Sequence, residues 1–316
     1  MLMVVICHAI GYVNEADLVG TIGIAKLAIN QLCLVCVNVF VMISGWFRIE
    51  ASWKGAAKLL FQVLFIALLC FCLFAVLGMP VSFRKDLLPY LLFGYGYWFV
   101  VSYLILCALS PVLNAFAEKA SHKELSGVIF AFFLAEFVFG FLLDAGHFDF
   151  GFSPLSFIGL YLLASYARTC PAKLFSLKKW VDFAIYFGAS VLSMFGFWFG
   201  YKWFGMGFHL NHYDSPLAII ASLYFLLFFS KLEFQSRFVN WMAASAFAIY
   251  LIHTNSLVYP YFRQCALFIT ENNSLIASAG LLFIFTITSA FLCILIDKPR
   301  ILIWGFISKR LDRNHP

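Results

Sequence analysis

Two histidines lie within apolar stretches of the sequence and are the first candidates for chemistry. His8 follows the run Leu2–Cys7, and His253 follows the run Ala246–Ile252. A neutral imidazole can take the proton of a hydroxyl group and so act as a general base. Tyr250 lies three residues before His253 and shares its helical face. Tyr250 or His253 could then stabilise a developing oxyanion by hydrogen bonding. We therefore take His8, His253 and Tyr250 as candidate catalytic residues.

Few other ionisable side chains occur in apolar stretches, and each has a structural interpretation beside a functional one. Lys26 could stabilise an oxyanion or extend outward to the membrane surface. Glu136 is either functional or a protonated structural carboxyl. His209 and His212 with Asp214 are metal-ligand types, but one pair without a third spaced ligand is a weak signal. We expect no metal site.

The composition limits the class of protein in which this chemistry could operate. Of 316 residues, 64% are hydrophobic and only 11% are charged, against about 25% charged in soluble domains. So few polar residues could not cover a soluble globule. The composition excludes a soluble enzyme, a disordered chain and a nucleic-acid-binding domain. It predicts an all-α, polytopic membrane bundle, one domain over residues 1–316, surrounded by membrane lipid.

Ten apolar segments are expected to form the transmembrane helices, since a span needs about 20 apolar residues. The first segment is short and has no basic residue before it, so we expect an N-terminally truncated helix that is completed by coding sequence upstream of Met1. The ten segments are residues 1–13, 21–47, 56–78, 88–114, 125–143, 154–167, 181–203, 216–230, 239–262 and 274–296.

The distribution of Lys and Arg predicts the sidedness of these segments. The even-numbered connections and the C-terminal tail hold 16 of these side chains, and the odd-numbered connections hold 4. Basic residues gather in cytoplasmic loops, so both termini should be cytoplasmic. His253 then lies fourteen residues into its segment, ~21 Å from the cytoplasmic end. His8 lies near the outer end of its own segment. Both histidines are expected in the outer half of the membrane.

A cluster of basic and polar residues closes the second segment on the predicted cytoplasmic side. It contains Ser44, Trp46 and Arg48, and Lys54 and Lys58 follow directly. Guanidinium and ammonium groups bind phosphate well. The cluster could therefore bind a phosphate-bearing cytosolic ligand, or it could be ordinary positive charge that contacts anionic lipid.

Several of these stretches resemble the acyltransferase-3 family of integral membrane O-acyltransferases. The resemblance spans nearly the whole chain in the family's order, and its nearest branch acylates bacterial surface polysaccharides. It is carried by Leu2–His8, Asn38–Phe47, Tyr97–Phe99, Leu109–Asn114, Tyr213–Pro216 and Ala248–His253.

The resemblance implies an activity and assigns roles to residues. It implies transfer of an acyl group, usually acetyl, from cytosolic acyl-CoA to a hydroxyl of a cell-surface or lipid-linked glycan, in the bacterial inner membrane. Acetyl-CoA would be a substrate, with no tightly bound cofactor. His8 would be catalytic, and Arg48 with its neighbours would face the coenzyme. The family pairs this histidine with an Arg eleven positions earlier, which falls upstream of Met1. The alternatives are a glycan or lipid transporter or flippase, and an inactive relative that lacks this Arg.

Overall fold

The computed structural model describes residues 1–11, 13, 18, 20–92, 96–207 and 209–314, and within these ranges it contains helices and loops but no strand. The predicted connection at Asn14–Asp17 lies outside the described residues. Six helical stretches are long and apolar enough to cross a membrane. The all-helical, multi-span prediction is therefore confirmed, while the count of ten, the sidedness and the single domain stay predictions. The six are Thr21–Phe47, Trp53–Val76, Trp98–Lys119, His122–Leu142, Lys179–Phe204 and Leu275–Arg310.

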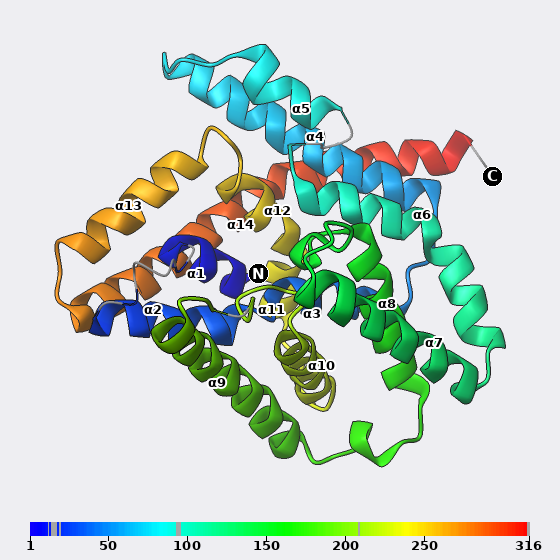
Figure 1. The fold of residues 1–316 in the computed structure, drawn as a ribbon. Helices are drawn as coiled ribbons and strands as arrows, with labels where there is room; N and C mark the ends of the chain where they lie inside the picture. The colour runs from blue at the N-terminus through cyan, green and yellow to red at the C-terminus, as the bar shows by residue number, and fades with distance from the viewer. Residues whose placement is uncertain (12, 14–17, 19, 93–95, 208, 315–316) are drawn as a thin grey trace. The chain divides into compact units, whose positions relative to one another are not determined.

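The chain divides into two compact units, and the first comprises residues 1–11, 52–101 and 235–316. Within it, α1 packs against α12, α13 and α14, and α4 packs against α5, α12 and α14 (Figure 1). The short helix α1 therefore contacts elements from the other end of the sequence. The helices of this unit are α1 (Leu2–Ile10), α4 (Trp53–Val76), η2 (Phe83–Leu87), α5 (Leu88–Leu91), α11 (Arg237–Ala243), α12 (Ala246–His253), α13 (Tyr259–Glu271) and α14 (Leu275–Asn314).

The second unit comprises residues 12–51 and 102–234. Its closest pairs are α9 with α10 and α3 with α8, and α2 packs on α9 (Figure 1). Helix α6 begins in the first unit and belongs to the second from Ser102 onward. The helices are α2 (Thr21–Cys33), α3 (Cys36–Phe47), α6 (Trp98–Lys119), α7 (His122–Ala135), η3 (Glu136–Leu142), η4 (Asp149–Gly151), α8 (Pro154–Thr169), η5 (Lys173–Phe175), α9 (Lys179–Phe204) and α10 (Pro216–Ser230).

Local sequence explains several helix ends. The Ser121 side chain accepts from the Glu124 backbone N–H while the Glu124 carboxylate accepts from the Ser121 N–H at 2.8 Å, which forms a capping box at the start of α7. Pro154 and Pro216 begin α8 and α10, at positions where no backbone N–H is needed. Gly45 lets α3 approach α8, because a Cβ there would lie 2.2 Å from the Tyr161 carbonyl oxygen.

Several predicted segments have different boundaries in the structure, and the largest differences concern three of them. The segment predicted at 88–114 is divided between α5 and α6. The segment predicted at 239–262 is divided into α11, α12 and the start of α13, with turns at residues 244–245 and 254–258. Apolar composition does not reveal such breaks. The backbone groups of a turn can hydrogen-bond to neighbouring helices, so a turn can form without a polar stretch of sequence. Helix α14 also continues past residue 296 through the expected tail.

Candidate functional site

The structure brings His8 and His253 together, although 245 residues separate them in the sequence. His8 lies near the end of α1, and His253 is the last residue of α12. The His8 Nδ1 and the His253 Nε2 are 2.8 Å apart, which is hydrogen-bonding distance, and the ring centroids are 5.0 Å apart. His253 is buried and His8 is half-buried. The more accessible imidazole is therefore that of His8.

The hydrogen bonds of the pair fix which nitrogen of each ring carries the proton. The His253 Nδ1 lies 2.5 Å from the carbonyl oxygen of Ile249, and a carbonyl can only accept, so the proton is on Nδ1. In a neutral His253 the Nε2 is then an acceptor, and the His8 Nδ1–H donates to it. A neutral His8 consequently has its lone pair on Nε2. The pair leaves one imidazole nitrogen available as a base.

Helix α13 supports both rings with residues that the sequence analysis did not select. Tyr259 packs edge-on against His8 with centroids 5.9 Å apart, and Phe262 packs against His253 at 5.4 Å. The Arg263 Nη1 donates to the carbonyl oxygens of His8 and Ala9, at 3.1 and 2.7 Å. Arg263 directly follows the predicted segment 239–262, so the sequence analysis counted it only among the four basic residues of the odd-numbered connections. The available signal was the four-residue spacing of Tyr259 and Arg263, which places both on one helical face.

A tyrosine network holds the turn that follows His253. The Tyr97 hydroxyl donates to the Leu251 carbonyl oxygen at 2.6 Å and accepts from the Asn255 side chain at 3.1 Å. The backbone N–H of Ser256 donates to the Tyr90 hydroxyl at 2.9 Å. These bonds satisfy backbone and side-chain groups that the end of α12 would otherwise leave buried without partners.

Tyr250 lies beside the histidine pair, mainly in an aromatic environment. Its ring centroid is 6.5 Å from that of His253, and it packs against Tyr97 at 5.7 Å and Phe99 at 5.9 Å. Tyr250 is buried. The Phe99 backbone and the Thr254 side chain also form hydrogen bonds with its hydroxyl group, while an oxyanion role stays a prediction.

The five residues predicted to bind the coenzyme fall in different units. Ser44, Trp46 and Arg48 belong to the second unit, whereas Lys54 and Lys58 lie on α4 in the first. Within the second unit these three residues have partners. The Arg48 guanidinium pairs with Glu118 at 2.8 Å, the Ser44 and Tyr103 hydroxyls are 2.9 Å apart, and Arg168 donates to the Trp46 carbonyl oxygen. In the first unit, the Lys54 ammonium lies 6.0 Å from the Trp53 ring centroid.

The second unit also contains a polar cluster around the segment that precedes α10. Asn38 donates to the Tyr213 carbonyl oxygen at 2.9 Å, and Gln31 donates to the Asn211 side chain at 3.3 Å. Asn30 also donates to Asn211. Lys26 lies on the same helix as Asn30 and Gln31, in the other unit from His8. The cluster therefore anchors the loop that precedes α10. Lys26 and His8 belong to different units, so neither unit by itself brings them together.

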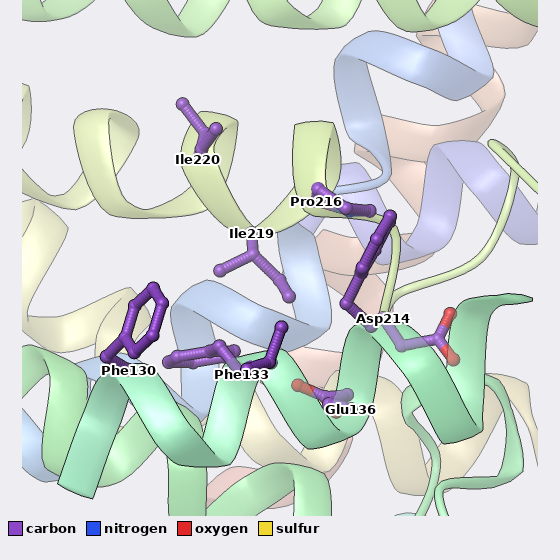
Figure 2. A pocket seen from close by; sticks show the side chains of 9 residues that line it. Phe130, Phe133, Glu136, Asp214, Pro216, Ile219 and Ile220 are labelled. Carbon is purple, nitrogen blue, oxygen red and sulfur yellow. The ribbon is translucent and has the colours of Figure 1, made fainter. Parts of the chain in front are cut away.

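Two acidic residues of this unit, Glu136 and Asp214, are buried beside an apolar groove of about 400 Å³ between α7, η3 and α10 (Figure 2). Aromatic and aliphatic side chains of α7, η3 and α10 line this groove. Burial raises the pKa of Asp214 to about 6. Burial, and then the charge of His209, lower the pKa of His212 to about 4. In the described ranges, no three His, Cys, Asp or Glu side chains come together to hold a metal ion.

Comparison with known proteins identifies the family of this chain. A family model described as an acyltransferase domain, that of the acyltransferase-3 family, matches residues 1–296 of the 316. No curated protein and no solved structure matches the chain. An imidazole whose Nε2 carries no proton, in a chain whose described residues form helices with several apolar spans, suits the activation of a hydroxyl for acyl transfer. The protein is a membrane acyltransferase and belongs to the acyltransferase-3 family.

Proposed function

We propose that this protein transfers an acyl group, acetyl in the simplest case, from cytosolic acyl-CoA to a hydroxyl of a cell-surface or lipid-linked glycan. The observation that carries the proposal is the hydrogen-bonded pair of His8 and His253, whose bonds leave the His8 Nε2 unprotonated. A sugar hydroxyl is a poor nucleophile, so its attack on a thioester needs a base at this position.

The proposed reaction balances with His8 as the only proton carrier. The glycan oxygen attacks the thioester carbonyl carbon while its proton moves to the His8 Nε2. The carbonyl electrons move to oxygen and return as the carbon–sulfur bond breaks. The His8 imidazolium then gives its proton to the departing CoA thiolate. His253 stays neutral and accepts the His8 Nδ1–H throughout. A donor such as the Tyr250 hydroxyl would stabilise the transient oxyanion.

The proposed coenzyme contact on the cytoplasmic side is Arg48, with Ser44, Trp46, Lys54 and Lys58 near it in sequence. Arg48 is a quarter exposed and pairs with a Glu118 side chain that is 61% exposed. Such an exposed pair contributes at most about 1 kcal/mol, so a phosphate group could displace the carboxylate. Loss of this contact would weaken the binding of the substrate and of the transition state by similar amounts. Arg48→Ala should therefore raise the KM for acyl-CoA more than it lowers kcat.

The proposed location is the bacterial cytoplasmic membrane, with ten spans and both termini in the cytoplasm. The motivation is the excess of Lys and Arg in the even-numbered connections and the tail. A reporter that is active only in the cytoplasm, fused to the carboxyl terminus, should give signal. Activity there of a reporter that works only in the periplasm would contradict this topology.

Release of CoA thiol by the purified, full-length protein in lipid nanodiscs tests the function. The protein would receive acetyl-CoA and a glycan extract from its own cells. Replacing the proposed base, as in His8→Ala, should lower the glycan-dependent rate by about 10²–10⁴-fold. The matched control is His147→Ala, because His147 is exposed and lies in the second unit.

Three outcomes would contradict the proposal. Full activity of a normally folded His8→Ala variant would remove the proposed base. Movement of glycan or lipid across the bilayer with acetyl-CoA left intact would favour a transporter or flippase. No thioester consumption with any glycan would favour an inactive relative.

A further inference from the structure

The charged side chain of Arg263 contacts the backbone of the proposed base. The first turn and the last turn of a helix each leave backbone groups without helical partners, and at the carboxyl end these are carbonyl oxygens. Helix α1 has only nine residues, so its last turn is a large part of it. The Arg263 Nη1 donates to the His8 carbonyl oxygen at 3.1 Å and to the Ala9 carbonyl oxygen at 2.7 Å. A cation at this end of a helix is also electrostatically favoured.

The end of α1 is shaped to receive this guanidinium. Gly11 has φ 77° and ψ 175°, a conformation that is essentially restricted to glycine. A Cβ at Gly11 would lie 2.5 Å from the Arg263 Nη2 and 2.8 Å from its Cζ. The absence of a side chain at residue 11 therefore leaves the space that the guanidinium fills. The Gly11 N–H donates to the Cys7 carbonyl oxygen at 2.9 Å, so the helix ends at the residues that the Arg263 guanidinium contacts.

One face of α13 thus contacts His8 at two levels. Tyr259 packs against the imidazole ring, and Arg263, one turn later, binds the carbonyl of the same residue. Helix α13 therefore contacts both the backbone and the ring of His8. The position of the His8 Nδ1 relative to the His253 Nε2 depends on both contacts.

We propose that Arg263 is a positioning residue, which holds the end of α1 so that the His8 ring stays hydrogen-bonded to His253 with its Nε2 directed to the acceptor hydroxyl. This inference rests on the proposed function for its kinetic consequence, and on geometry alone for its effect on the ring. Arg263 acts through His8 and is not itself a catalytic residue.

Kinetics of Arg263 variants form the first test. Arg263→Met keeps most of the side-chain volume and removes the donors, so kcat should fall about 2- to 30-fold, the range of a cation at a helix carboxyl end. The KM for acetyl-CoA should stay within about twofold. Arg263→Lys should recover part of kcat, because an ammonium can reach a carbonyl but lacks the fork of the guanidinium. Arg84→Met, at an exposed arginine of the same unit, is the matched control.

A double variant separates positioning from general damage. In the His8→Ala background, Arg263→Met should cause no further loss of kcat, because residues that act as one unit are non-additive. Full multiplication of the two losses would overturn the proposal, as would a loss confined to KM, which would mean that Arg263 contacts substrate. An unchanged kcat in both Arg263 variants would overturn it as well.

Chemical modification tests the geometry without any acyl transfer. Diethyl pyrocarbonate acylates unprotonated imidazole nitrogens, and peptide mass spectrometry locates the adducts. In the wild-type protein His8 should be modified and His253 should not, because both nitrogens of His253 are hydrogen-bonded and the side chain is 2% exposed.

In Arg263→Met, or in Arg263→Lys if the first variant does not fold, His253 should become modified as the pair separates. A modification pattern identical to the wild type in a folded variant would overturn the positioning role. Absence of acyl transfer by the wild-type protein, with the modification pattern as expected, would instead refute only the proposed function.

Discussion

Replacing His253 is the most direct way to test the chemistry of the histidine pair. When His8 takes the hydroxyl proton it becomes an imidazolium, and its bond to the neutral His253 becomes charge-assisted. A neutral hydrogen bond contributes about 0.5–1.5 kcal/mol, and one to a charged group about 1.5–3 kcal/mol. The bond is therefore stronger in the transition state by about 1–1.5 kcal/mol, which corresponds to about 5- to 13-fold in rate. His253→Ala should lower kcat by this factor.

The assay is acetyl-CoA consumption by the full-length protein in nanodiscs at saturating glycan. The KM for acetyl-CoA should change little, because the lost bond strengthens only in the transition state. His253→Gln should retain more activity than His253→Ala, because an amide oxygen can accept the His8 Nδ1–H. Thr270→Ala is the control, since the Thr270 hydroxyl donates to the Ala266 and Leu267 carbonyl oxygens of its own helix. A kcat equal to wild type in His253→Ala would refute the reasoning. A loss as large as that of His8→Ala, without recovery in His253→Gln, would also refute it.

Two further predictions concern the second unit. Asp182 is fully buried and pairs with Lys231 at 2.5 Å, while Lys231 is a quarter exposed. Asp182→Ala should therefore destabilise the protein by about 1–3 kcal/mol, less than a fully buried pair, and Asp182→Ala with Lys231→Met should recover part of the loss in a thermal-unfolding assay. The raised pKa of Asp214, about 6, reduces stability as pH rises from about 4 to 6, whereas the lowered pKa of His212, about 4, increases it over the same range. Asp214→Asn removes the Asp214 contribution and leaves that of His212. The unfolding temperature of this variant should therefore rise more steeply with pH than that of the wild type. Parallel plots of unfolding temperature against pH would refute these protonation states.

The sequence alone predicts the class of fold because the signal is compositional. A stretch of about 20 apolar residues can satisfy its backbone in lipid only as a helix. The segments at 56–78 and 181–203 therefore correspond closely to α4 and α9. Breaks within apolar stretches are different, because they depend on distant partners. The turn after His253 is held by Tyr90 and Tyr97, which sequence periodicity cannot connect to it.

The candidate site was partly predictable for a similar reason. An ionisable residue in an apolar helix is costly, so His8 and His253 were conspicuous in the sequence. Their direct contact, and the proton positions that follow from it, required the packing of α1 against α12. Arg263 was not conspicuous, because an arginine near a helix end is the expected case in a membrane protein. Only its bonds to the carbonyls of α1 distinguish it from an ordinary interfacial charge.

The break between α12 and α13 explains how so short a stretch of sequence can surround His8. In one continuous helix, Tyr259 would lie ~9 Å beyond His253 along the axis and Arg263 ~15 Å beyond it, at 1.5 Å per residue. Neither side chain could then reach His8, which is the hydrogen-bond partner of His253. The turn at residues 254–258 ends α12 and lets α13 pack on α1 as well. The same chain segment thereby supplies the partner of the His8 ring and the support of its backbone. Any change that made residues 246–263 a continuous helix should separate these two contacts while leaving hydropathy unaltered.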